Sequence, residues 1–158
     1  MLPWTQGRGY SFSLPVTRFL RGWRQCLSSA SRIRGRLAHG GLLLVPVTVQ
    51  GQDFEFLIDT GAAYTALSKE MISFLGLSLT PQRTILIAPA QGRTFHAPVL
   101  GIPELRIGGF RLTNVTAILL EFPPALKLDG VLGMNVLKQF RTTIETDTAT
   151  LVLRLVTR

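Results

Sequence analysis

The chain has 158 residues and a formal net charge of +8, and 46% of its residues are hydrophobic. This length suffices for one domain with a modest core and an extension, but it excludes two complete catalytic lobes. The single cysteine excludes an internal disulfide, and one cysteine with two distant histidines, His39 and His96, provides no metal site. The cysteine count is compatible with a reducing compartment, so we expect a cytoplasmic protein that needs no metal or other cofactor.

The positive charge belongs to the first part of the chain. Residues 1–40 contain seven Arg and no Lys, Asp or Glu, whereas residues 41–158 contain ten Lys and Arg and nine Asp and Glu. Because the second part is nearly neutral, its charge gives no support to nucleic-acid binding. We therefore expect a basic extension over residues 1–40 and one folded domain over residues 41–158.

The extension has apolar residues at helical spacing, from Val16 to Leu37, with several Arg beside them. A basic amphipathic helix of this kind over residues 13–38 would make weak contact with an anionic membrane surface or act as a targeting sequence. The alternative is a disordered leader, or sequence upstream of the true start. No apolar run reaches the ~20 residues needed to span a bilayer. His39-Gly40-Gly41 resembles a hinge, so a chain that starts near Gly40 is expected to fold.

The rest of the chain is composed of β-hairpins with short helices between them. A strand is expected over residues 42–49, then a turn over residues 50–52 and a returning strand that contains Phe54, Phe56 and Ile58. A helix is expected over residues 69–75, which Ser68 caps and Gly76 ends. Three more hairpins are expected over residues 84–97, 104–120 and 140–156, together with a buried strand at Val131-Leu132 and a short helix capped by Asn135. This pattern indicates an all-β domain with one or two short helices.

The first strands lead to a carboxylate in an unusual position. In Phe56-Leu57-Ile58-Asp59-Thr60-Gly61-Ala62, an apolar run ends in an Asp, which is costly to bury unless it is paired or neutralised. One interpretation is a turn in which the Asp side chain bonds its own backbone. The other is a carboxylate whose position is used in catalysis. The tripeptide alone does not decide between them.

The sequence that surrounds Asp59 favours catalysis. A later stretch, Gly130-Val131-Leu132-Gly133-Met134-Asn135, has two apolar residues and a Gly before a short helix. Together with Ile58-Asp59-Thr60-Gly61-Ala62, this stretch resembles the retropepsin-like aspartic proteases of clan AA, most closely their small bacterial single-domain members. The resemblance runs from about Leu42 to Leu155. It implies a closed β-barrel of hairpins that is active as a homodimer and cleaves polypeptides bound in an extended conformation.

The resemblance also implies roles for individual residues. Asp59, Thr60 and Gly61 would be catalytic, and the hairpin over residues 84–97 would be a flap closing over the substrate. The substrate-binding residues would be Ala62, Ala90, Gln91, Gly92, Arg93, Val131 and Leu132. Without the resemblance, this hairpin would be read as a simple exposed one, and His96 as a surface residue of it.

A single carboxylate cannot act as acid and base at once in amide hydrolysis, whereas two that share a proton can. The chain has one Asp-Thr-Gly, so the second carboxylate must be Asp59 of another copy. Retroviral members have acidic residues after Asp-Thr-Gly-Ala and an Arg after the second Gly, where this chain has Ala63, Tyr64 and Met134. The other acidic candidate, Asp129, precedes Gly130 and is interpreted as a turn or capping residue.

Two functions remain open at this stage. The first is an aspartic endopeptidase in which each subunit of a homodimer supplies one Asp59. The second is a catalytically silent module with the same fold that dimerises or binds peptides. The intact Asp59-Thr60-Gly61 favours the enzyme, because a silent module has little reason to keep a carboxylate there.

Overall fold

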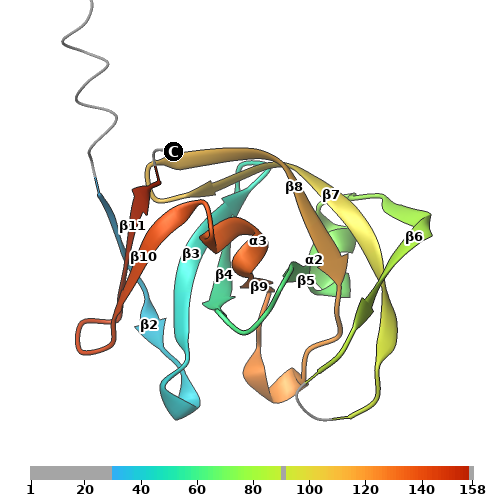
Figure 1. Cartoon of the computed structure of the whole chain (residues 1–158), viewed down its shortest axis with the longest axis horizontal. Helices are drawn as coiled ribbons and strands as arrows, with labels where there is room; N and C mark the ends of the chain where they lie inside the picture. Colours follow the sequence, from blue (N-terminus) through green and yellow to red (C-terminus); the bar gives the residue numbers. More distant parts are fainter. Residues whose placement is uncertain (1–29, 90–91, 157–158) are drawn as a thin grey trace, which may run out of the picture.

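The computed structural model describes residues 30–89 and 92–156. Most of these residues lie in strands (Figure 1). The strands are β1 (Ser31–Arg34), β2 (Arg36–Leu37), β3 (Leu43–Val49), β4 (Gln52–Ile58), β5 (Thr65–Leu67), β6 (Leu79–Ile87), β7 (Phe95–Ile107), β8 (Phe110–Leu119), β9 (Gly130–Leu132), β10 (Phe140–Glu145) and β11 (Thr150–Leu155). The helices are η2 (His39–Gly41), α2 (Lys69–Phe74), η3 (Pro124–Leu126) and α3 (Met134–Leu137). None of the helices described is both long and apolar enough to cross a membrane.

The larger sheet closes into a barrel. Its strand order is β2-β3-β4-β9-β5-β8-β7-β6, and β3 also pairs with β7. The closed ring therefore consists of six strands in the order β3-β4-β9-β5-β8-β7, and β2 and β6 are attached outside it. The all-β barrel with short helices that the sequence predicts is confirmed.

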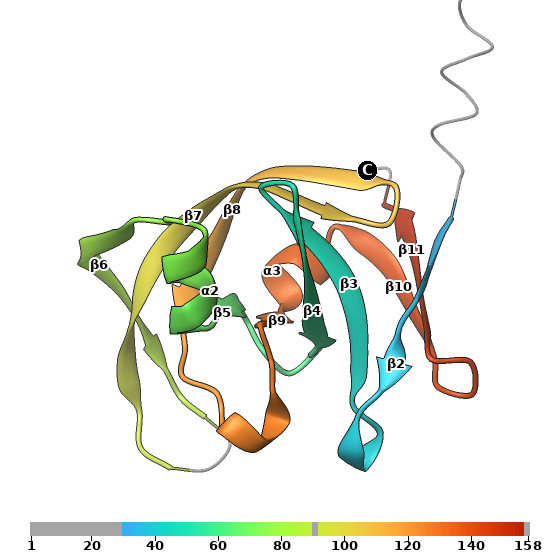
Figure 2. The same ribbon diagram turned by 180° about the vertical axis from the view of Figure 1, so that it is seen from behind.

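The smaller sheet has the order β1-β11-β10 and lies at one end of the molecule, opposite the β6–β7 hairpin (Figures 1 and 2). Its inner face joins the same core as the barrel, since Ile33, Leu151 and Leu153 are buried together with Val45 and Ile107. One continuous hydrophobic core thus supports both sheets.

Strands β1 and β2 lie in the region that the sequence analysis assigns to the extension. Ser31 to Arg34 pair with Leu153 to Thr150 of β11, and Ile33 is 5% exposed. Between β1 and β2, Gly35 lets the backbone lie close to β3, because a Cβ at this position would lie 2.0 Å from the carbonyl oxygen of Leu44. The folded unit therefore includes residues 31–37, in contrast to the expected boundary at residue 40. Residues Ser31 to Arg34 alternate between polar and apolar and form a strand, so they are not part of the expected amphipathic helix. Residues 13–29 of that expected helix lie outside the described residues.

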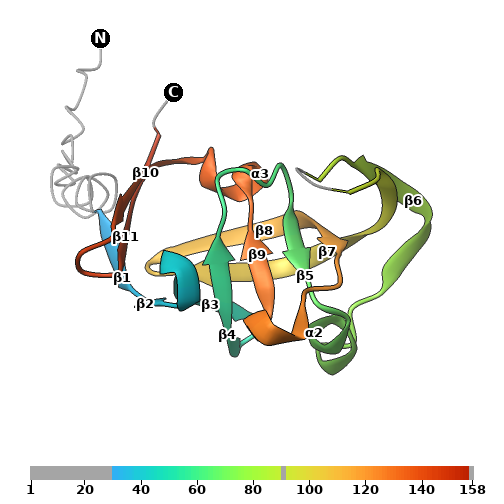
Figure 3. The ribbon, with the colours of Figure 1, turned by 90° about the horizontal axis from the view of Figure 1, so that it is seen from below.

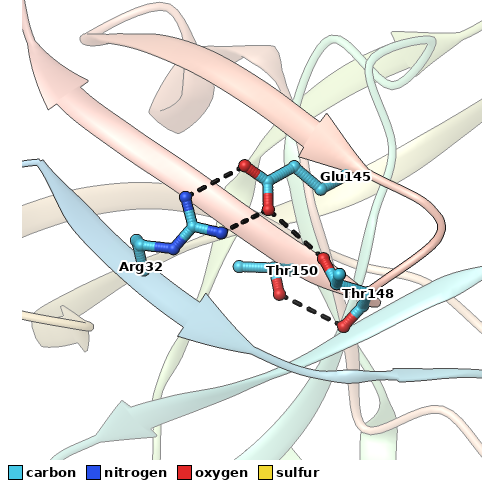
Figure 4. Close-up of polar contacts among 4 residues, drawn as sticks. All are labelled: Arg32, Glu145, Thr148 and Thr150. Carbon is cyan, nitrogen blue, oxygen red and sulfur yellow. Dashed lines mark hydrogen bonds and ion pairs between the residues drawn. The ribbon is translucent and has the colours of Figure 1, made fainter.

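An ion pair ties β1 to β10 across the middle strand of the small sheet. Arg32 donates two hydrogen bonds to the carboxylate of Glu145, and Thr148 donates a third at 3.2 Å (Figure 4). These contacts lower the pKa of Glu145, with the hydrogen bonds from Arg32 as the main cause. The side chain of Arg32 is 59% exposed, so the pair positions β1 more than it stabilises the fold.

The local predictions for the helices have different outcomes. The Ser68 hydroxyl accepts a hydrogen bond from the Met71 N–H at 3.1 Å, which confirms the cap of α2. At α3 the residue before the helix is Gly133, so Asn135 is not the cap that the sequence suggests. Its side chain instead bonds to two strands of the barrel, as described below.

Candidate active site

Asp59 lies where β4 ends beside the parallel strand β9. The pairing aligns Ile58 with Leu132, and the Asp59 N–H continues it by donating to the Leu132 carbonyl oxygen at 3.2 Å. The loop that leaves β4 and the loop that leaves β9 consequently emerge side by side from the same edge of the sheet (Figure 3). This edge places the carboxylate of Asp59 at the surface of the barrel, where it is half-buried.

The carboxylate is oriented by its own loop. Asp59 Oδ1 accepts a hydrogen bond from the Gly61 N–H at 2.8 Å, and the Ala62 N–H donates to the Asp59 carbonyl oxygen at 3.3 Å. A Cβ on Gly61 would lie 3.2 Å from Asp59 Oδ1, so Gly at this position leaves room for the carboxylate. The turn interpretation of the Asp-Thr-Gly tripeptide and the catalytic one are therefore compatible, because the turn is what directs the carboxylate.

The segment after β9 is hydrogen-bonded to the loop that carries Asp59. The N–H groups of Met134 and Asn135 donate to the carbonyl oxygens of Ala62 and Ala63 at 2.8 and 3.1 Å. This contact needs Gly133, because a Cβ there would lie 2.4 Å from the backbone of Tyr64. Two loops 70 residues apart in sequence thus form one rigid unit.

Asn135 connects this unit to the barrel. Its side-chain oxygen accepts hydrogen bonds from the N–H and the hydroxyl of Thr65 at 2.8 and 2.9 Å, and its amide donates to the Thr116 carbonyl oxygen at 2.7 Å. Thr65 is completely buried, and its hydroxyl also accepts from the Gly133 N–H at 3.3 Å. The sequence carries no signal for this network beyond the polar residue Asn135 itself, because its partners are distant in the chain.

A groove of about 600 Å³ opens above Asp59. Its described lining is Asp59, Gly61, Ala62, Ala63, Tyr64, Ala66, Leu86, Ile87, Ala88, Pro89, Ile118, Leu120 and Val131. Among these residues Asp59 alone carries a carboxylate, and the others are small, apolar or aromatic. The groove can therefore hold apolar side chains next to one acidic group.

The sequence-derived substrate residues are only partly in this groove. Ala62 and Val131 line it, whereas Leu132 is completely buried in the core because successive residues of a strand face opposite sides. Gly92 and Arg93 are exposed beside the tip of the β6–β7 hairpin and do not line the groove, while Ala90 and Gln91 lie outside the described residues. The hairpin contributes residues 86–89 instead, and the exposed Thr60 borders the carboxylate without lining the groove.

The other polar candidates have structural roles or lie elsewhere. Asp129 Oδ2 accepts a hydrogen bond from the Glu55 N–H at 2.9 Å, so this carboxylate ties a turn to β4 and does not face the groove. His96 lies on the exposed face of the β6–β7 hairpin, 3.2 Å from the Thr84 hydroxyl. In the described part of the chain, no three His, Cys, Asp or Glu residues are grouped so that they could hold a metal ion.

Comparisons with known proteins agree with this geometry. Residues 45–139 match the family described as gag-polyprotein putative aspartyl protease. The structure is similar to that of a retropepsin-like aspartic protease from Rickettsia conorii, with 24% identity and a TM-score of 0.61 over 80% of this chain and 92% of that one. It is also similar to the retroviral protease-like domain of Ddi1 from Leishmania major, with 17% identity and a TM-score of 0.48 over 73% of this chain and 94% of that one. No curated protein sequence matches the chain.

Proposed function

Since the chain belongs to the family of gag-polyprotein putative aspartyl proteases and has the retropepsin-like fold, we propose that it is an aspartic endopeptidase. In this proposal the enzyme is a homodimer, and the Asp59 carboxylates of the two subunits together activate the water that hydrolyses a peptide bond. The observation that carries the proposal is the groove of about 600 Å³ in which Asp59 is the single carboxylate among the described residues.

The need for a second copy follows from the chemistry. Amide hydrolysis requires one group that takes a proton from water and another that gives a proton to the scissile carbonyl oxygen. Two adjacent carboxylates perform both tasks when they share one proton, as is known for aspartic proteases. Because Asp129 is held at β4 by the Glu55 N–H, the described residues include no second carboxylate beside Asp59 in the groove.

The residues around Asp59 would divide the work of the reaction. One carboxylate takes a proton from the bound water while the other protonates the carbonyl oxygen, which gives a tetrahedral gem-diol and no covalent intermediate. Gly61 holds Oδ1 through its N–H and lets the backbone approach the water. Thr60, which is exposed in the single chain, would form hydrogen bonds across the two-fold axis and brace the two loops.

The substrate in this proposal is a polypeptide bound in an extended conformation. It would lie between the active-site loops and the β6–β7 hairpin, adding a strand to the backbone on either side. The walls formed by Ala62, Ile87 and Val131 would contact apolar side chains next to the scissile bond. The tip residues 90–93 would cover the peptide. We also propose a location in the cytoplasm, with weak membrane contact limited to the part of residues 13–38 that precedes β1.

The direct test is Asp59→Asn, a nearly isosteric change that removes one carboxylate from each subunit. We expect it to abolish cleavage of an unstructured protein and to leave dimerisation measured by sedimentation intact, because it also removes the repulsion between two like charges. Asp53→Asn is the matched control, since Asp53 is exposed on β4 outside the groove and an Asn oxygen can still accept from Thr48. Wild-type activity should be sensitive to pepstatin and should fall as pH rises and the shared proton is lost.

The dependence on two copies has its own signature. Specific activity should fall when the protein is diluted into the range where sedimentation reports single chains, and added Asp59→Asn protein should lower activity more than an equal dilution does. Activity that remains proportional to concentration among single chains would contradict the shared site. Peptide binding or dimerisation with no cleavage at any pH would favour the silent module instead.

A further inference from the structure

A second cavity of about 520 Å³ adjoins the groove above Asp59. Tyr64 lines both cavities and so belongs to the wall of each. We call the groove above Asp59 the apolar compartment and the second cavity the polar compartment. The polar compartment is lined by residues 83, 85, 111–116, 135 and 139 together with Tyr64. Nothing in the catalytic proposal uses the polar compartment.

The two compartments follow each other along the same strands. On β6, Arg83 and Ile85 line the polar compartment and Ile87 lines the apolar one. On β8, Thr116 lines the polar compartment and Ile118 the apolar one. Residues two apart in a strand share a face and are separated by about 7 Å, which is also the distance between alternate side chains of an extended peptide. An extended substrate with one side chain in the apolar compartment can therefore place another in the polar compartment.

The polar compartment has a positive charge. Arg83 and Arg111 line it, and its described lining includes no Asp or Glu. The carboxylate of Glu104 lies outside the lining and is shared by Arg106 and Arg111, with nitrogen–oxygen distances of 2.6 Å to each. Hydrogen bonds from Arg111 and Arg106 lower the pKa of Glu104, and one carboxylate can balance the charge of only one of the two guanidinium groups. With Arg83 added, the region keeps an excess of cationic donors.

The chemistry of the other donors is consistent with an acidic ligand. Asn114, Thr113 and Gln139 add amide and hydroxyl groups to the lining. A guanidinium group binds a carboxylate through two parallel N–H donors, which makes Arg83 suited to an Asp or Glu side chain. A lysine side chain in the same place would face Arg83 and Arg111 and would be repelled.

We propose that the polar compartment is a substrate subsite that selects an acidic side chain, two residues along the extended peptide from a side chain held in the apolar compartment. This inference rests on the proposed function and specifies its substrate class: segments that combine an apolar residue near the scissile bond with a nearby Asp or Glu. Arg83 is the residue that sets the preference, since Arg111 is already engaged with Glu104.

The test compares fluorogenic peptides that differ at one position, with Glu, Gln or Lys placed in turn two residues from the apolar residue on either side. For wild-type protein we expect kcat/KM for the Glu peptide to exceed that for the Gln peptide by about three- to tenfold at low ionic strength, through KM, and the Lys peptide to be poorest. In Arg83→Gln the Glu and Gln peptides should become equal, and in Arg83→Glu the order of Glu and Lys should reverse. Lys69→Gln removes the same unit of charge from α2, which lines neither compartment, and should keep the wild-type order.

A second readout separates this subsite from catalysis. Fluorescence anisotropy with Asp59→Asn protein measures binding of the same labelled peptides without turnover, and the Glu peptide should bind more tightly, by a margin that shrinks as salt is raised. If wild-type protein cleaves none of the peptides while the Glu peptide still binds more tightly, the proposed enzyme is overturned and the subsite is supported. Equal cleavage or binding of the Glu and Gln peptides, or a preference that survives Arg83→Gln, would overturn the subsite and leave the enzyme intact.

Discussion

Strand β1 offers a sharp test of how this domain is built, because it lies in a part of the sequence that reads as a dispensable extension. Two truncated proteins separate the alternatives. One begins at residue 30 and keeps β1 and β2, and the other begins at residue 41 and lacks both. We expect the first to unfold at the same urea concentration as the full chain and the second to be strongly destabilised.

The magnitude follows from what β1 buries. Ile33 is 5% exposed in the common core, and replacing a buried Ile with Ala costs about 2–5 kcal/mol. The Gly35 N–H donates to the Ala149 carbonyl oxygen, and the Gly109 N–H donates to the Ser31 hydroxyl, each bond contributing roughly 0.5–1.5 kcal/mol. Removal of β1 should therefore cost about 3–8 kcal/mol, out of a total that is typically about 5–15 kcal/mol for a domain.

The assay is urea unfolding followed by circular dichroism at one fixed protein concentration, since any dimerisation would make stability depend on concentration. At a slope of about 2 kcal/mol per molar urea, a loss of about 2–5 kcal/mol in Ile33→Ala should lower the midpoint of the full chain by about 1–2.5 M. Arg34→Ala is the matched control, because Arg34 is exposed on the same strand. Equal midpoints for the two truncated proteins, or for Ile33→Ala and wild type, would refute the assignment of β1 to the core.

Two further predictions concern the polar network and pH. Asn135→Ala removes three hydrogen bonds and leaves the N–H and the hydroxyl proton of the buried Thr65 without their acceptor. It should therefore lower the free energy of unfolding by about 3 kcal/mol and slow any cleavage. Gln139→Ala at the exposed neighbouring turn should be nearly neutral. Acid should destabilise the fold, because Arg32 lowers the pKa of Glu145 below its ordinary value of 4.5 in the folded state. This contribution is complete above about pH 4.5 and is lost as pH falls through the lowered pKa, so Glu145→Gln should flatten that part of the stability curve measured by thermal unfolding.

Most local elements could be predicted from the sequence because their signals are local. The alternation of Val45, Val47 and Val49 gives a strand with one buried face, and the Gln50-Gly51 turn joins it to β4 with both residues at positive φ. Ser68 lies three residues before the N–H that it caps, so its role is readable from neighbours. The position of Asp59 was also predictable, since an apolar strand that ends in Asp-Thr-Gly places the Asp at the end of the strand.

The features that the sequence did not reveal depend on partners far along the chain. Four residues around Ile33 are too few to distinguish strand alternation from the helical spacing of the residues before them, and their pairing partner β11 comes at the other end of the protein. The same holds for Asn135, whose position after Gly133 suggests a helix cap until Thr65 and Thr116 are seen beside it. Leu132 was assigned to the groove with Val131, although neighbours in a strand cannot both face it.

The site combines one fixed side with one side set by a hairpin, and this division has a consequence for specificity. Below the carboxylate, the N–H groups of Met134 and Asn135 hold the loop that carries Asp59, so we expect the position of Asp59 to be the same whichever peptide is bound. Above it, Arg83 and Ile85 of β6 line the polar compartment, and residues 86–89 at the end of β6 and in the turn after it line the apolar one. Substitutions on β6 should therefore alter which peptides are bound without displacing the carboxylate, whereas substitutions in the Asn135 network should affect all substrates alike. A change at Arg83 that lowered cleavage of every peptide by the same factor would contradict this division.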